Sequence, residues 1–72
     1  MDPYKNLNGN SGVTGYDAGA DFIIIRFQNN ATYRYSYESA GRENIEKMKL
    51  LARSGKGLST FISRHVKDKY EK

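Results

Sequence analysis

The chain has 72 residues, no cysteine and a single histidine, His65. A chain of this length forms one domain with a thin core, and neither disulfides nor a zinc site of clustered His and Cys ligands is available to support it. Twelve basic and eight acidic side chains give a net charge of +4, and the longest apolar run, residues 22–25, is far shorter than the ~20 residues of a membrane-spanning helix. We therefore expect a small basic protein without metal, cofactor or membrane contact, and the lack of cysteine is consistent with the reducing cytoplasm.

The first half of the chain is predicted to form strands. Residues 1–12 are polar and rich in Asn and Gly, which predicts a flexible N-terminal tail ahead of a single domain over residues 13–72. Apolar and aromatic residues, interrupted by turn residues such as Asn, Asp and Gly, predict strands over residues 13–16, 22–28 and 31–37. Because short turns join these consecutive strands, an antiparallel meander is expected.

The second half is predicted to be helical, because the apolar residues now recur at spacings of three and four. This pattern predicts helices over residues 42–53 and 58–69, and Gly55 between them suits the left-handed position that ends a helix. The expected fold is therefore α+β: a three-stranded antiparallel β-meander followed by two helices packed on one face of the sheet, in the order β-β-β-α-α.

The turn at Asn29 and Asn30 decides which way the tyrosines of the third strand point. A two-residue turn would put these tyrosines and the isoleucines of the second strand on different faces of the sheet. A three-residue loop with a left-handed Asn30 pairs Ile25 with Tyr33, so that isoleucines and tyrosines share one face. We favour the three-residue loop, because it makes one face clearly more apolar than the other.

Several short motifs occur along the chain in a recognisable order. They are Gly15-Tyr16-Asp17, an apolar strand ending at Phe27, Tyr33-Arg34-Tyr35, Ser54-Gly55-Lys56-Gly57 and Arg64-His65-Val66-Lys67-Asp68-Lys69-Tyr70. Together they resemble the KTSC domain family, which is named for a C-terminal extension of some bacterial lysyl-tRNA synthetases and whose hallmark is a central Tyr-x-Tyr. The chain departs from the family at Asn30, where glycine is usual, and its stretch 58–63 is longer, as in the stand-alone bacterial and phage members. The resemblance implies RNA as a partner, through the synthetase context.

The basic charge is concentrated in the C-terminal part. Residues 1–41 carry three basic and four acidic side chains, a net charge of −1, whereas residues 42–72 carry nine basic and four acidic, a net charge of +5. Such asymmetry fits an anionic partner such as tRNA or single-stranded RNA. It equally fits a solvated helical surface that keeps the protein in solution.

The candidate binding residues follow from these patterns. Aromatic rings on a strand are suited to stack on nucleobases, and nearby cations to contact phosphates. The residues in question are Tyr35 and Tyr37 for stacking, and Arg34, Lys56, Arg64, Lys67 and Lys69 for phosphates. The competing interpretation is that the tyrosines belong to the core and that the loop at Lys56 is a simple turn between helices.

No catalytic constellation is visible in the chain. The carboxylates are scattered, and no nucleophile has a base at a useful spacing, which predicts a binding domain rather than an enzyme. The alternative to nucleic-acid binding is a protein-interaction or self-association module. Two helices cover only one face of the expected sheet, and the other face would present Phe22 and Ile24 to a protein partner or to a second copy in a homodimer.

Overall fold

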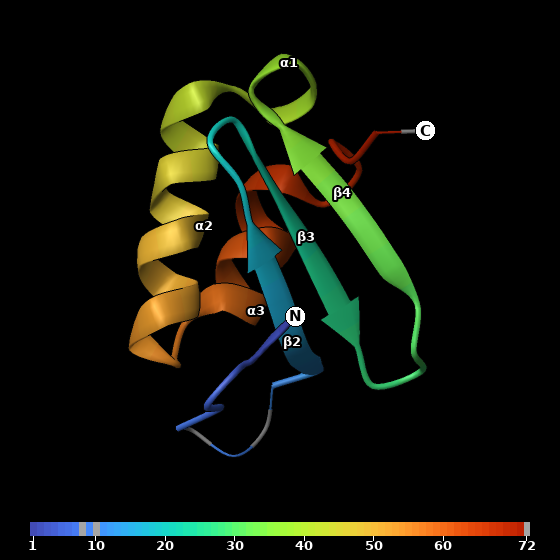
Figure 1. The fold of residues 1–72 in the computed structure, drawn as a ribbon, viewed down its shortest axis with the longest axis vertical. Helices are drawn as coiled ribbons and strands as arrows, with labels where there is room; N and C mark the ends of the chain where they lie inside the picture. Colours follow the sequence, from blue (N-terminus) through green and yellow to red (C-terminus); the bar gives the residue numbers. More distant parts are fainter. Residues whose placement is uncertain (8, 10, 72) are drawn as a thin grey trace.

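The structure is a computed structural model that describes residues 1–7, 9 and 11–71. It consists of an antiparallel sheet in the order β1-β2-β3-β4, with helices packed on one of its faces (Figure 1). The strands are β1 (Asp2–Pro3), β2 (Val13–Ala18), β3 (Phe22–Phe27) and β4 (Thr32–Ser36). The helices are α1 (Tyr37–Ala40), α2 (Arg42–Ser54), α3 (Leu58–Phe61) and the π-helical turn η1 (Ile62–Val66) that continues α3. The expected α+β class, with helices on an antiparallel sheet, is confirmed.

The sheet has four strands rather than the three predicted, because residues of the expected tail pair with β2. Asp2 lies opposite Tyr16 and Pro3 opposite Gly15. A side chain on Gly15 would place its Cβ 3.2 Å from the Asp2 carbonyl oxygen. Glycine at this position therefore leaves room for β1 beside β2. Residues 1–7 therefore belong to the folded domain, whereas Asn8 and Asn10 of the predicted tail lie outside the described residues.

The hairpin between β3 and β4 has the predicted three-residue loop. The Phe27 amide donates to the Ala31 carbonyl, and the Asn30 amide donates to the Phe27 carbonyl, both at 2.9 Å. Asn30 has a φ of 67°, a left-handed conformation that Asn adopts more readily than most residues. The resulting register pairs Ile25 with Tyr33 and Ile23 with Tyr35, so these four side chains share the face that the helices cover.

The third predicted strand ends earlier than expected. The Ser36 hydroxyl accepts a hydrogen bond from the Ser39 amide, and the Ser39 hydroxyl accepts one from the Ser36 amide. This reciprocal capping box starts α1 at Tyr37, which the sequence pattern had placed in the strand. Tyr37 therefore leaves the face that Tyr33 and Tyr35 share.

The helices agree with the predicted period but not with all predicted bounds. Gly55 ends α2 with a φ of 81°, as its left-handed position requires. The predicted second helix is divided into α3 and η1 and stops at Val66 instead of residue 69. Its buried residues Leu58, Ile62 and Val66 recur every four residues, and the wider π turn keeps them on one face better than 3.6 residues per turn would.

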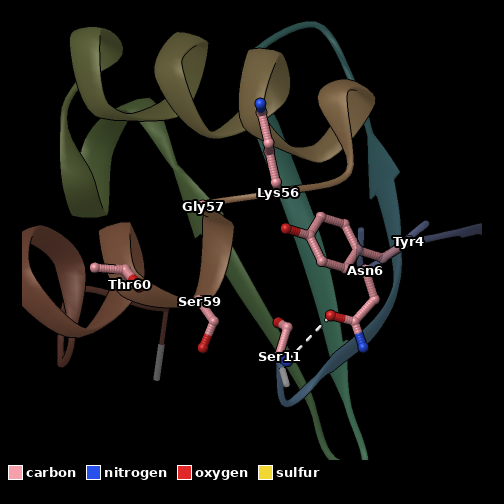
Figure 2. A pocket seen from close by; sticks show the side chains of 7 residues that line it. All are labelled: Tyr4, Asn6, Ser11, Lys56, Gly57, Ser59 and Thr60. Atoms are coloured by element: carbon pink, nitrogen blue, oxygen red, sulfur yellow. Dashed lines mark hydrogen bonds between the residues drawn. The ribbon is translucent and has the colours of Figure 1, made fainter. Parts of the chain in front are cut away.

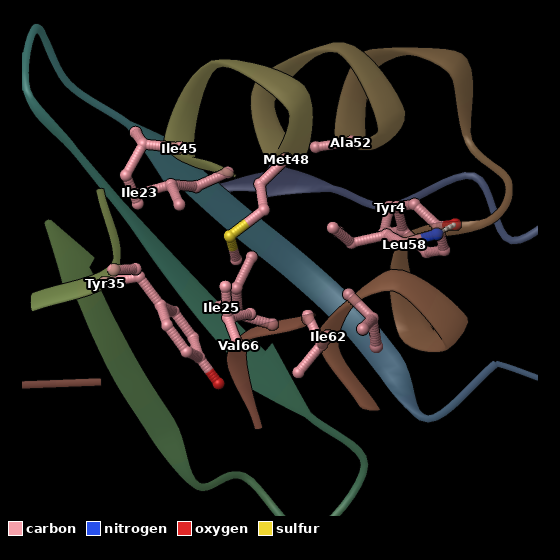
Figure 3. Packing of buried hydrophobic residues seen from close by; sticks show 12 residues of the cluster. Tyr4, Ile23, Ile25, Tyr35, Ile45, Met48, Ala52, Leu58, Ile62 and Val66 are labelled. Atoms are coloured by element: carbon pink, nitrogen blue, oxygen red, sulfur yellow. Dashed lines mark hydrogen bonds between the residues drawn. The ribbon is translucent and has the colours of Figure 1, made fainter. Parts of the chain in front are cut away.

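One thin core lies between the helices and one face of the sheet, as the chain length predicts. Figure 3 shows the Met48 side chain reaching from α2 toward Ile25 and Val66, so that it joins the sheet to the last helical segment. The buried apolar side chains are Tyr4, Val13, Ile23, Ile25, Tyr35, Ala40, Ile45, Met48, Ala52, Leu58, Ile62 and Val66.

Candidate nucleic-acid interface

Tyr35 belongs to the core. Only 2% of its surface is exposed, and its ring packs edge-on against Tyr70 with centroids 6.2 Å apart. Burial, followed by the nearby Tyr33 and Tyr70 hydroxyls, raises the pKa of Tyr35 to about 12. The predicted role of Tyr35 in base stacking is therefore wrong, because the surrounding core leaves its ring faces inaccessible to a base.

Tyr37 is held by α2 rather than projecting from the sheet. Its hydroxyl donates to a Glu46 carboxylate oxygen at 2.7 Å, and the Lys49 ammonium donates to the same oxygen at 2.8 Å and to the Ala20 carbonyl at 2.9 Å. The hydrogen bond to Glu46 raises the pKa of Tyr37, and the bonds from Lys49 and Tyr37 lower that of Glu46. This cluster ties α1, α2 and the turn before β3 together, so the strand platform proposed for Tyr35 and Tyr37 is not formed.

Arg34 points to the face of the sheet opposite the core. Its Nε lies 2.9 Å from a Glu71 carboxylate oxygen, and its guanidinium carbon lies 4.0 Å from the centroid of the Phe22 ring. The Glu71 amide also donates to the Arg34 carbonyl at 2.6 Å, which brings the C-terminal segment alongside β4. A hydrogen bond from the Ser36 hydroxyl, with help from Arg34, lowers the pKa of Glu71. The Arg34 charge is thus partly neutralised within the protein itself.

Arg64, Lys67 and Lys69 are all exposed on the last helical segment and the residues after it. Within residues 1–7, 9 and 11–71, the ion pairs are Arg34–Glu71 and Lys49–Glu46. The charges of Arg64, Lys67 and Lys69 are therefore not paired with any described carboxylate. These three residues are called the C-terminal cations below, and they are predicted phosphate-binding residues whose charges no described carboxylate neutralises.

Lys56 is likewise exposed and lies in the loop between α2 and α3. It borders a polar cavity of about 160 Å³ lined by Tyr4, Asn6, Ser11, Lys56, Gly57, Ser59 and Thr60. Figure 2 shows the Lys56 side chain extending toward α2, away from the Ser59 and Thr60 side chains. The expected phosphate contact at Lys56 therefore has no support from converging donors.

A second concave surface, which the sequence patterns did not indicate, lies where β3 turns into β4. It is a shallow groove of about 380 Å³ lined by Gly12, Phe27, Gln28, Asn29 and Tyr33. The rings of Phe27 and Tyr33 meet edge to face, with centroids 5.6 Å apart and an interplanar angle of 68°. The confirmed register gave a signal for this pair, because it puts Phe27 and Tyr33 on one face near the same end of the hairpin.

No family model, curated protein or solved structure matches the chain. Across the described ranges, no helix is long and apolar enough to cross a bilayer. Over the same ranges, no three side chains of His, Cys, Asp or Glu gather in a way that could hold a metal ion.

The raised pKa of Tyr35 predicts a loss of stability at alkaline pH. Both folded and unfolded chains keep this proton below the usual value of 10.0, so the full contribution of the protonated Tyr35 is present there. Between that value and about 12 the unfolded chain ionises first, and stability falls progressively. An alkaline titration of phenolate absorbance, followed alongside circular dichroism, should show Tyr35 ionising late, together with unfolding. The absorbance change that accompanies unfolding should be smaller in Tyr35→Phe.

Proposed function

We propose that the chain is a small, non-catalytic, cytoplasmic domain of the KTSC type that binds RNA, either tRNA or a single strand. The observation that carries the proposal is the exposed set of C-terminal cations, Arg64, Lys67 and Lys69, which have no carboxylate partner in the described chain. The phosphate groups of RNA carry the negative charge that would pair with these cations. The ordered motifs from Gly15 to Tyr70 support the family, and the lack of cysteine supports the compartment.

The proposal makes binding electrostatic and therefore sensitive to salt. Each cation that meets a phosphate releases a counterion from the strand, and for single strands the slope of log K against log salt is about −0.7 per contact. Three contacts from the C-terminal cations then weaken binding about 20-fold between about 50 and 200 mM salt. A neutral interface of the same area would show almost no such dependence.

Reversing two of these charges tests the surface. In fluorescence anisotropy with labelled single-stranded RNA and with tRNA, Arg64→Glu with Lys67→Glu is expected to weaken binding at least tenfold at about 50 mM salt and to flatten the salt slope. The matched control is Arg42→Glu with Lys47→Glu, which makes the same change of net charge at exposed positions of α2. The control should bind nearly as the unchanged protein does.

Equal affinity of the unchanged protein and Arg64→Glu/Lys67→Glu would show that the C-terminal cations are not the contact surface. Equal losses in both double variants would assign binding to net charge alone. Either outcome would favour the second candidate function, which is protein interaction. It would use the sheet face that the helices leave open (Figure 1), where Arg34 covers Phe22.

A further inference from the structure

The groove between β2 and the β3–β4 hairpin combines aromatic walls with an uncharged lining. Phe27 and Tyr33 are both half-buried, so part of each ring remains open to solvent. Among the described residues, no charged side chain lines the groove, and its volume of about 380 Å³ falls within the range of small-ligand sites. An occupant is therefore expected to be flat, uncharged and polarisable.

Two carboxamides at the rim give the groove hydrogen-bonding groups in defined positions. The Gln28 backbone N–H donates to the Gly12 carbonyl at 2.9 Å. The Gln28 side-chain Nε2 donates to the Ser11 carbonyl at 3.3 Å. The Asn29 Oδ1 accepts from the Ala31 amide at 3.0 Å. The side-chain bonds of Gln28 Nε2 and Asn29 Oδ1 hold the two carboxamides. Within the described residues, the Gln28 Oε1 and the Asn29 Nδ2 have no hydrogen-bond partner.

The groove also adjoins the cationic part of the chain. The Tyr33 ring, which forms one wall, packs against Tyr70 with centroids 4.7 Å apart. Lys69 directly precedes Tyr70, and Lys67 lies two residues earlier. A strand whose phosphates meet the C-terminal cations therefore has an uncharged aromatic groove within reach of its bases.

We infer that this groove takes one unpaired nucleobase of single-stranded RNA, a conclusion that rests on the RNA binding proposed above. A base is flat and uncharged, stacks on aromatic rings, and carries a hydrogen-bond donor beside an acceptor on its edge. The Gln28 and Asn29 side chains, which both line the groove, offer an acceptor and a donor to such an edge. Every base has a donor next to an acceptor, so the groove holds a base with little regard to sequence.

A substitution at Gly12 can fill the groove while leaving its aromatic residues unchanged. A Cβ on Gly12 would lie 3.9 Å from the Phe27 Cδ1, which is ordinary van der Waals contact, and the residue has no positive φ that would strain a side chain. Gly12→Leu is therefore expected to fold and to place its larger side chain in the groove. Gly12→Ala is the matched control, since one methyl group leaves most of the volume free.

The experiment compares two labelled RNA strands of equal length, one with bases and one abasic, by fluorescence anisotropy at about 50 mM salt. Both strands carry the same phosphates, so only the base contacts differ. The unchanged protein is expected to bind the abasic strand about 5- to 150-fold more weakly. Gly12→Leu should lose a similar factor with the normal strand and almost nothing with the abasic strand. Gly12→Ala should follow the unchanged protein, and circular dichroism checks that both variants fold.

The two proposals fail in different ways. Equal affinity of the unchanged protein for the normal and abasic strands would overturn the nucleobase groove and leave the phosphate surface intact. Full binding of the normal strand by a folded Gly12→Leu would also overturn the groove. No saturable, salt-sensitive binding of either strand would overturn the RNA proposal and the groove together.

Discussion

Replacing Tyr35 by alanine is expected to leave the domain unfolded in water. Tyr35 is 2% exposed and lies in the core with the rings of Tyr33 and Tyr70 around it. Truncating a buried aromatic residue to alanine costs about 3–5 kcal/mol. A core of this size rarely supplies more than about 3–5 kcal/mol in total, so the loss removes essentially all of the stability. Far-ultraviolet circular dichroism with urea titration measures the effect.

The matched control is Tyr35→Phe, which keeps the ring and removes only the hydroxyl. Its unfolding midpoint should lie close to that of the unchanged protein. A Tyr35→Ala protein that unfolds at nearly the same urea concentration would show that the ring is not part of the core. Loss of RNA binding in Tyr35→Ala would report unfolding and not the loss of a stacking surface.

Replacing Tyr4 by alanine is expected to destabilise the domain almost as strongly, although it lies in the segment predicted as a tail. Tyr4 is 6% exposed, and its hydroxyl oxygen accepts a hydrogen bond from the Leu58 amide at 3.3 Å. The substitution removes a buried ring, at about 3–5 kcal/mol, and leaves the first amide of α3 without its partner. Tyr4→Phe removes the hydrogen bond alone and should cost about 1–2 kcal/mol. Urea unfolding of both variants separates packing from the hydrogen bond.

Leu7→Ala provides the control within the same segment. Leu7 is 64% exposed, so its truncation should change the free energy of unfolding by no more than about 0.5 kcal/mol. If Tyr4→Ala were as stable as Leu7→Ala, the N-terminal segment would indeed be a loose tail. The contrast between the two variants therefore measures how far β1 and Tyr4 belong to the domain.

The candidate site was predictable only in its charged part. Arg64, Lys67 and Lys69 follow the outward positions of an amphipathic segment, and charged side chains stay in water unless they are paired. Tyr35 and Tyr37 were assigned to stacking from their alternation along a strand. Alternation gives the face of a residue but not what covers that face, and here Tyr35 is buried in the core with the Tyr70 ring packed against it. The groove at Phe27 was missed because Gly12, which borders it, lies in the stretch expected to be a tail.

Local sequence by itself determined the elements whose energetics are local. The spacing of Ile45 and Met48 set the buried side of α2, and Gly55 set its end. Both depend on preferences within a few residues. The hairpin register followed from the more apolar sheet face, and a left-handed Asn30 is compatible with it. Only the tertiary structure decided that Tyr4 enters the core, since its partner Leu58 lies 54 residues away. It also decided that Glu71 neutralises Arg34, a contact across 37 residues. Desolvation and ion pairing depend on which distant segments meet, and short-range patterns do not specify those meetings.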